Sequence, residues 1–314
     1  MTTVHNRRDF LKTSALAAAG LGLMPNLKGP RVGDDPLFQI SLAEWSVNRA
    51  LFTGKMDPLD FARFSKENGI DAVEYVNQFF KDKAKDQAYL REMKTRADGE
   101  GVRSVLIMCD GEGAIGHPDE KERVQAVENH KKWVEAAQFL GCHAIRVNGF
   151  VSPEWGTPPG DYDAELNQVA DGLRRLCEFA DPHGISVIIE NHGGNSSNGQ
   201  WLAGVMKKAD HPRAGTLPDF GNFRISRDRT YDSYQGVAEL MPYAKGVSVK
   251  PHVWDNEGNQ SDLDYDRMMK IVLDAGFRGY CGIEHGREGT EAEDIQAVRQ
   301  ALEATRERMQ ASYQ

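Results

Sequence analysis

The chain reads IIE at 188–190, TLPD at 216–219, VKPH at 249–252 and GIE at 282–284. Each stretch is a short apolar run closed by a side chain that can bind a metal ion, and the closing residues lie about 30 residues apart. One strand plus one helix takes about that length, so the closing residues can lie at equivalent ends of successive parallel strands. The spacing therefore predicts a parallel α/β fold in which Glu190, Asp219, His252 and Glu284 converge on one point.

Strand and helix patterns alternate outward from these stretches to both ends of the chain. Short apolar segments predict eight strands, and stretches with an apolar period of 3.6 residues predict eight helices. Glycines at 69, 101, 141, 184 and 276 mark places where a helix must end before the next strand. The expected strands are 37–42, 72–74, 102–108, 144–147, 186–190, 215–219, 246–250 and 279–284, and the expected helices are 58–68, 87–101, 119–140, 166–183, 200–210, 233–243, 264–275 and 291–309.

Eight strands alternating with eight helices close most economically as a (β/α)₈ TIM barrel, although an open doubly wound sheet has the same alternation. The sequence has no Gly-x-Gly-x-x-Gly or Walker-type loop after the first expected strand, which weighs against the open sheet. One barrel of about 250 residues uses nearly all of a 314-residue chain. We therefore expect an α/β single-domain TIM barrel over residues 34–314.

Residues 1–33 have a different character. Arg7 and Arg8 precede a Phe-Leu-Lys run and an apolar stretch over 15–24, a pattern that resembles a twin-arginine (Tat) export signal. An amphipathic first helix is the alternative interpretation. The apolar stretch is too short to span a bilayer stably, so no membrane insertion is expected beyond the signal segment. Because no clean Ala-x-Ala cleavage motif follows, the expected exported, periplasmic protein could also keep the signal as a membrane tether.

The charge of the chain argues against two classes of partner. It has 38 Lys and Arg against 47 Asp and Glu, a net charge of −9 and no basic run. Nucleic acids and anionic membranes need clustered basic side chains, so neither is expected to bind. The four cysteines are scattered without framework spacing, which favours buried thiols.

The four converging residues form a set of three carboxylates and one imidazole. Such a set suits one divalent ion, Mn²⁺, Mg²⁺, Co²⁺ or Zn²⁺. His252 stands apart from the others, since Lys250 lies two positions earlier and Pro251 bends the chain between them. A displaced ligand or a water molecule at the fourth position is the alternative. If Lys250 faces the site, it either holds a substrate oxygen or forms a salt bridge with a barrel acid.

His192 follows Glu190 by two residues, so a continuing strand places both on the same side. Its imidazole is then a proton shuttle or a binder of substrate hydroxyls, and a hydrogen bond to a neighbouring loop is the competing interpretation. Arg146, on the fourth expected strand, is interpreted as the partner of Glu190 in an internal salt bridge.

Other side chains at the expected strand ends are candidates for substrate binding. Glu74 and Asn148 could satisfy sugar hydroxyls. Trp45 and Trp254 fall just beyond strand ends, where aromatic rings can cover the apolar face of a sugar.

The pattern as a whole resembles the xylose-isomerase-like TIM-barrel superfamily of sugar isomerases and epimerases, over residues 37–313. The resemblance implies one divalent metal held by Glu190, Asp219, His252 and Glu284, with Glu190 and Glu284 exchanging protons with a substrate carbon. Two features depart from relatives: Asn222 stands where many have a histidine, and the trinuclear zinc set of the related endonucleases is not apparent. The stretches that carry the resemblance are DAVEY at 71–75, ENHG at 190–193, DFGN at 219–222, His252, and GIE at 282–284.

These residues predict an enzyme that removes a proton next to a carbonyl and passes through an enediolate. Because phosphorylated sugars are largely cytoplasmic, export favours an unphosphorylated sugar as the substrate of an isomerase or epimerase. The first alternative is a metal-dependent lyase or hydratase of 3-keto-glycosides or inosose-like compounds, and the second is a non-catalytic sugar-binding barrel. The expected partner is a small carbohydrate, and the resemblance suggests a homo-oligomer.

Overall fold

The computed structural model describes residues 36–152, 154 and 158–313. The predicted signal segment at 1–33 lies outside these residues. None of the helices in the described ranges combines the length and the apolar character that crossing a membrane requires.

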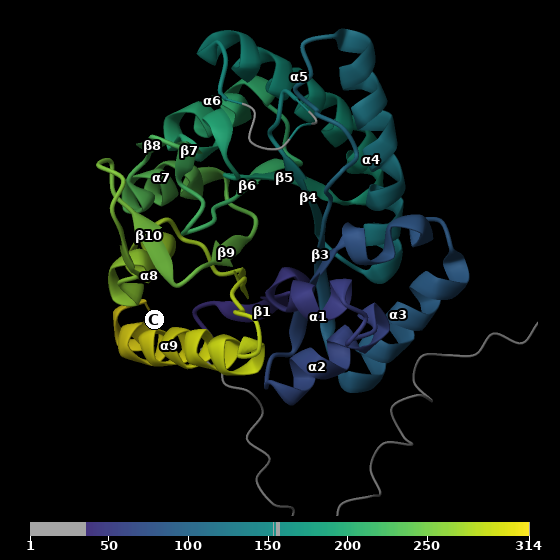
Figure 1. Cartoon of the computed structure of the whole chain (residues 1–314), viewed down its shortest axis with the longest axis vertical. Coiled ribbons are helices and arrows are strands. Elements are labelled where there is room, and N and C mark those ends of the chain that lie inside the picture. The colour runs from purple at the N-terminus through teal and green to yellow at the C-terminus, as the bar shows by residue number, and fades with distance from the viewer. Residues whose placement is uncertain (1–35, 153, 155–157, 314) are drawn as a thin grey trace, which may run out of the picture. The chain divides into compact units, whose positions relative to one another are not determined.

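Eight parallel strands follow one another around a barrel, with the helices outside it (Figure 1). Neighbouring strands pair in chain order, and the last barrel strand pairs with the first. Two parallel bridges, Thr216 with Ala244 and Asp219 with Ser248, join the remaining edges. The predicted (β/α)₈ TIM barrel is confirmed. Its strands are β1 Gln39–Ala43, β2 Ala72–Val76, β3 Arg103–Met108, β4 Ala144–Asn148, β5 Ser186–Glu190, β6 Ala214–Leu217, β9 Val247–Val249 and β12 Tyr280–Ile283.

The helices begin and end where local chemistry places them. Side-chain caps start most of them: Asp86, Asp119 and Asp161 each accept a hydrogen bond from a backbone N–H of the first turn that follows. Gly101 and Gly141 end two of them in the left-handed conformation that glycine adopts without strain. The helices are α1 Asn48–Phe52, α2 Phe61–Glu67, α3 Gln87–Glu100, α4 Glu120–Leu140, α5 Tyr162–Ala180, α6 Gly199–Ala209, α7 Ser233–Leu240, α8 Tyr265–Asp274 and α9 Glu291–Tyr313.

Two antiparallel hairpins that the sequence patterns did not predict interrupt the βα alternation. The first pairs β7 Arg224–Ser226 with β8 Arg229–Thr230, and the second pairs β10 His252–Trp254 with β11 Gln260–Asp262. The expected strand 246–250 therefore ends early, at Val249. Pro251 explains this, because it has no N–H for the ladder and restricts the backbone before it. His252 consequently begins a hairpin and does not end a barrel strand.

The strands are buried on both faces, which is why they read as nearly continuous apolar runs. One apolar cluster fills the barrel interior around Leu106, Met108, Ile188 and Leu217. A larger cluster lies between the strands and the helices. All four cysteines are buried and unbridged, as predicted.

A glycine in α5 lets the segment after β3 approach the helix. A Cβ added to Gly172 would lie 1.8 Å from the carbonyl oxygen of Ile115, a fixed backbone atom. The same segment carries Asp110 and Glu112, which line a cavity at the barrel mouth. Gly172 thus sets the position of one wall of that mouth.

We expect Gly172→Ala to lower the free energy of unfolding by about 1 to 3 kcal/mol, because the methyl group must displace backbone. The matched control is Gly99→Ala in α3, where nothing lies within 4 Å of the added Cβ. The control substitution should raise the free energy of unfolding by about 0.5 to 1 kcal/mol, since alanine is more stable than glycine inside a helix. Urea unfolding of the two variants measures both values, and equal effects would contradict the close contact.

Candidate functional site

Three carboxylates meet at the carboxyl ends of the barrel strands. Glu190 is the last residue of β5, while Asp219 and Glu284 follow β6 and β12 directly. One oxygen of each lies within 4.8 Å of an oxygen of the other two, and all three residues are buried. Over the described ranges, this group alone brings together three or more side chains of metal-binding type closely enough to hold an ion. It is a candidate acidic metal site at the face where TIM-barrel sites are built.

Lys250 extends into this cluster. Its Nζ donates hydrogen bonds to Asp219 Oδ2 at 2.5 Å and to Glu284 Oε1 at 2.7 Å. Burial alone would lower the pKa of Lys250, but the carboxylates of Asp219 and Glu284 raise it above its ordinary value. The side chain is therefore a permanent cation between two of the three acids. The predicted alternative for Lys250, a salt bridge with a barrel acid, is what the structure contains.

The structure does not bring His252 into the cluster. Its ring lies on the β10 hairpin, where a Cβ added to Gly221 would be 2.8 Å from His252 Nε2. The barrel-strand position that faces the acids belongs to Ser248, whose hydroxyl donates to Asp219 Oδ2 at 2.8 Å. The four-residue metal set stays a prediction: the three carboxylates lie together, with the Ser248 hydroxyl and the Lys250 ammonium against Asp219, while Pro251 separates His252 from the barrel strand.

The third carboxylate has partners of its own. Arg146 Nε lies 3.0 Å from Glu190 Oε2, which confirms the predicted ion pair, and Asn222 donates to Glu190 Oε1 at 2.8 Å. Arg146 also donates to Asp110 Oδ1 at 2.7 Å. Burial raises the pKa of Glu190, an effect that Arg146 opposes. Burial likewise acts to raise the pKa of Asp110, but Arg146 outweighs it and the net shift is downward.

In this arrangement the cluster does not fit a divalent ion. An ion bound to the facing oxygens of Asp219 and Glu284 would take the position of the Lys250 ammonium or lie beside it, where like charges repel strongly in a buried site. The donor set also offers no imidazole and a neutral Ser248 hydroxyl in its place. Binding of an ion therefore requires that Lys250 leave the cluster.

His192 belongs to a polar chain that starts at Arg146. Asp110 accepts from Asn148 Nδ2 at 2.7 Å, and Asn148 Oδ1 lies 2.8 Å from His192 Nδ1. Burial and the charge of Arg146 lower the pKa of His192 to about 4, so its imidazole is neutral at pH 7. One ring nitrogen of His192 thus has a side chain of β4 as its partner, and the His192 N–H donates to the Ser196 hydroxyl of the loop that follows.

Two cavities open at the barrel mouth and share Phe150, Ser152 and His192. One, of about 670 Å³, reaches Glu284 and includes Trp45 in its wall. The other, of about 760 Å³, has a wall that combines apolar side chains such as Phe150 with polar ones, among them Glu165, Asn195, Asn222 and Arg224.

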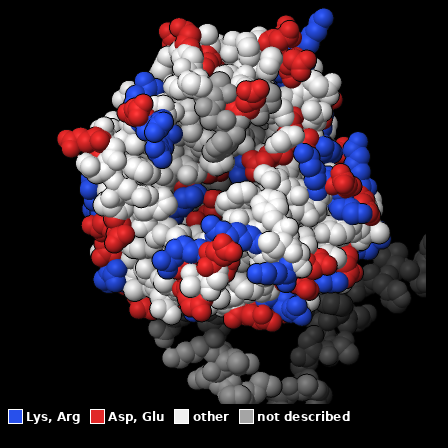
Figure 2. All heavy atoms as spheres, in the orientation of Figure 1, with Lys and Arg blue, Asp and Glu red and all other residues white. Residues whose placement is uncertain are grey.

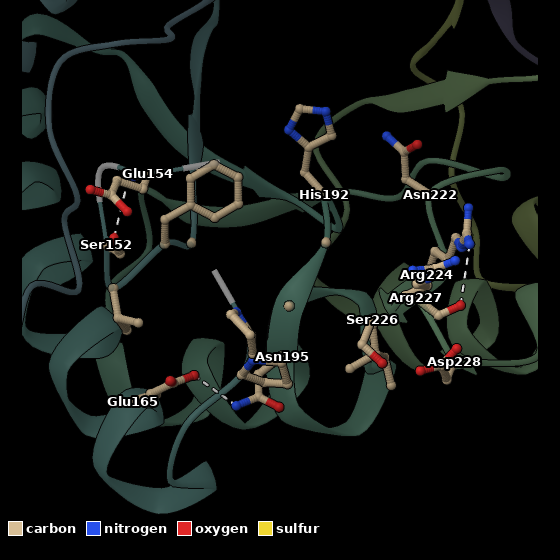
Figure 3. A pocket seen from close by; sticks show the side chains of 18 residues that line it. Ser152, Glu154, Glu165, His192, Asn195, Asn222, Arg224, Ser226, Arg227 and Asp228 are labelled. Atoms are coloured by element: carbon tan, nitrogen blue, oxygen red, sulfur yellow. Dashed lines mark hydrogen bonds between the residues drawn. The ribbon is translucent and has the colours of Figure 1, made fainter. Parts of the chain in front are cut away.

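The surface around the mouth carries both signs of charge. In Figure 2, acidic and basic side chains are interspersed over this face, and atoms of both kinds are visible in the hollow at its centre. In Figure 3, the His192 and Asn222 side chains extend in the same direction, away from the hydrogen-bonded pair of Glu165 and Asn195. The mouth therefore presents charged and polar side chains of both signs to a bound molecule.

Of the residues expected to bind substrate, two line a cavity and two do not. Trp45 and Asn148 line the smaller cavity, and the Trp45 ring packs edge-on against Phe52 with centroids 5.9 Å apart. Glu74 lines neither cavity, because it is buried in the barrel and accepts a hydrogen bond from Ser41. Trp254 also lines neither: its indole N–H donates to the carbonyl oxygen of Gly221.

Two contributors to the site were not predicted as site residues, Ser248 and Asn222. The strand pattern could have indicated Ser248, since it precedes Lys250 by two positions and so shares its strand face. Asp110, predicted as a polar group at the end of the third strand, pairs with Arg146 and Asn148. The contact of Asn222 with Glu190 depends on a loop conformation that carries no such periodicity.

The comparisons with known proteins agree with this geometry. Residues 62–308 match the family model described as xylose isomerase-like TIM barrel. The chain belongs to this family. Residues 5–24 match the model of the twin-arginine translocation pathway signal sequence, which supports export by that route. No curated protein matches the chain.

Solved structures with the same fold include three of interest. A 3-keto-D-glucoside 4-epimerase from E. coli has a TM-score of 0.62 and 19% identity, covering 79% of this chain and 94% of its own. A xylose isomerase-like TIM barrel protein from Mycobacterium smegmatis in complex with magnesium has a TM-score of 0.62, 17% identity and coverage of 85% and 97%. A probable 3-DHS dehydratase from Bacillus anthracis has a TM-score of 0.62, 14% identity and coverage of 85% and 99%.

Two further carboxyl groups of this xylose isomerase-like barrel, Glu44 and Glu74, are buried and form no ion pair with another described residue. Glu44 Oε2 accepts a hydrogen bond from the Val76 N–H at 2.7 Å, while its other oxygen has no hydrogen-bond partner among the described residues. Burial raises the pKa of Glu44 to about 8, and that of Glu74 also to about 8. Both side chains are therefore protonated in the folded protein at neutral pH.

We expect Glu44→Gln to remove a pH dependence of stability. The folded protein keeps the Glu44 proton up to about pH 8, whereas the unfolded chain releases it near pH 4.5. The stabilisation that this proton gives is present below the lower pH and is lost as pH rises to the higher one. The free energy of unfolding is measured with urea at pH 5 and at pH 9. From pH 5 to pH 9, the value for the variant should rise by about 2 to 4 kcal/mol relative to the value for wild type. A constant difference would contradict the buried neutral acid.

Proposed function

We propose that this xylose isomerase-like barrel is an enzyme that isomerises or epimerises an unphosphorylated sugar by proton transfer next to a carbonyl. The observation that carries the proposal is the position of Glu284. Its carboxylate lines the cavity and at the same time accepts a hydrogen bond from the Lys250 ammonium. A base and a cation thus lie side by side where a sugar carbonyl and its neighbouring C–H would enter.

The chemistry follows from what each side chain can do there. Glu284 takes the proton from the carbon next to the carbonyl, the C–H electron pair forms the double bond of an enediolate, and the carbonyl oxygen takes up the negative charge. A donor aimed at that oxygen lowers the barrier. Glu190, held by Arg146 and Asn222, lies next to Glu284 in the acidic cluster and is the second carboxylate of the proposal. Return of the proton to the neighbouring carbon isomerises, and return to the opposite face epimerises.

Other parts of the mouth fit a carbohydrate. Trp45 and Phe150 provide aromatic surface for the apolar face of a sugar ring. His192, neutral and fixed by Asn148, offers a ring nitrogen to a hydroxyl from the wall that both cavities share. The match to a twin-arginine signal supports export of such an enzyme, and a location outside the cytoplasm would give it access to free sugars and glycosides.

A lyase or dehydratase is the second candidate. The same enediolate can expel a substituent from the next carbon, and the chain has the fold of a probable dehydratase as well as that of a 3-keto-D-glucoside epimerase. A sugar-binding barrel without catalysis is the third. The metal-dependent form of any of these requires the three carboxylates to bind an ion in place of Lys250.

Deuterium wash-in separates the candidates. The full chain is incubated in D₂O with D-fructose, D-psicose, D-tagatose and methyl 3-keto-D-glucopyranoside, with and without Mn²⁺, and products are followed by NMR. We expect label on the carbon next to the carbonyl, and a loss of at least about 100-fold in Glu284→Gln, because the general base is gone. Glu178→Gln, an exposed carboxylate of α5, is the matched control and should keep the wild-type rate.

Each outcome of this experiment favours one candidate. Label with a changed configuration or a shifted carbonyl supports the isomerase or epimerase. Loss of a substituent supports the lyase. Absence of label from every sugar, despite binding, contradicts an enolising enzyme and leaves the sugar-binding barrel.

A further inference from the structure

We propose that Lys250 is the built-in cation of this site, so that the barrel works without a divalent metal ion. The catalytic part of this inference rests on the proposed function, whereas the statement about metal binding does not. The Lys250 Nζ lies 2.5 Å from Asp219 Oδ2 and 2.7 Å from Glu284 Oε1. These are two of the three carboxylates that could otherwise hold an ion.

The lysine side chain is held along its length and not only at its tip. A Cβ added to Gly221 would lie 3.0 Å from both Cβ and Cδ of Lys250, so the stem packs against the backbone after Asp219. The side chain is only 14% exposed. Gly221 therefore provides the space through which the ammonium reaches the acids.

The nitrogen ligand of a metal set is missing from the arrangement. Ser248 occupies the strand position that faces the acids, and its hydroxyl donates to Asp219 Oδ2, the oxygen that also accepts from Lys250. His252, the nearest histidine in sequence, starts the β10 hairpin after Pro251. The missing imidazole weighs against Zn²⁺, whereas for Mg²⁺ and Mn²⁺, which accept carboxylate oxygens alone, the Lys250 ammonium is the obstacle.

The third carboxylate, Glu190, also has a cation of the chain beside it. Glu190 faces Arg146 at 3.0 Å and accepts from Asn222 at 2.8 Å. Each of the three acids thus already has a cation within 3.0 Å that the chain itself provides. A divalent ion would have to displace one of these contacts, and in a buried site the like charges would oppose it.

The role of Lys250 in the reaction follows from this position. As Glu284 removes the proton, the carbonyl oxygen becomes negative, and an N–H of the ammonium donates to it. The electron pair of the C–H bond forms the carbon–carbon double bond, and the reverse movement returns the proton from the carboxyl group. No oxidant, reductant or second ion takes part.

Metal binding tests the inference without any substrate. The purified full chain is titrated with Mn²⁺, with bound ion followed by electron paramagnetic resonance and calorimetry. We expect no Mn²⁺ site in wild type up to millimolar concentration. Lys250→Met and Lys250→Gln remove the ammonium and leave the acids unpaired, so both should bind one Mn²⁺ at least 10-fold more tightly than wild type. Lys207→Met, which removes an exposed lysine of α6, should bind like wild type.

Each result of the Mn²⁺ titration either supports or overturns the inference. A micromolar Mn²⁺ site in wild type that Asp219→Asn abolishes would overturn the inference. So would folded Lys250→Met and Lys250→Gln proteins, checked by circular dichroism, that gain no Mn²⁺ site. If neither variant folds, the wild-type titration decides alone, with an absent site supporting the inference and a present one rejecting it.

Deuterium exchange in the presence of EDTA distinguishes this inference from the proposed function. Label that persists at the wild-type rate with EDTA supports a metal-free reaction. Label that disappears with EDTA and returns with Mn²⁺ overturns it while leaving the enolising function intact. Absence of label in both conditions rejects the proposed function, and the Mn²⁺ titration still decides what occupies the acidic cluster.

Discussion

The contact of Lys250 with Asp219 and Glu284 holds together the part of the barrel where closure is weakest. Between β6 and β9 the ladder consists of two isolated bridges, and one of them pairs Asp219 with Ser248. The Ser248 hydroxyl and the Lys250 ammonium both reach the Asp219 side chain from the β9 side of this seam. Glu284 on the other side of β9 accepts from the same ammonium. The Lys250 side chain therefore contributes both to the contacts across this seam and to the charge balance of the site.

Most of the fold could be predicted from the sequence, because parallel strands buried on both faces leave long apolar runs, and helices leave a period of 3.6 residues. All eight barrel strands and eight of the helices in the described ranges were found this way, but the five-residue helix α1 was not. The hairpins at 224–230 and 252–262 were not, because their strands are two or three residues long and mostly exposed or half-buried. Such segments have no apolar pattern, and only the contacts of the folded chain determine them.

The site could be predicted in part for a similar reason. Glu190, Asp219 and Glu284 follow regular strands, so their convergence follows from topology alone. Alternation also places Lys250 and His252 on one face, but that argument requires an unbroken strand, and Pro251 breaks it. Ser248 was passed over because its hydroxyl is not a side chain of the metal-binding type, although its strand position was plain. Contacts such as Asn222 to Glu190 arise between loops and have no counterpart in the spacing of residues.

A cation attached covalently to the backbone has an occupancy that no concentration can change. A bound ion equilibrates with its surroundings, so a protein that leaves the cell interior meets new competitors for it, whereas the Lys250 ammonium travels with the chain. Its strength is also fixed at one unit of charge, which a divalent ion would double. In the metal-free site proposed for Lys250, electrophilic strength is therefore lower, and activity is independent of the metal supply around the protein.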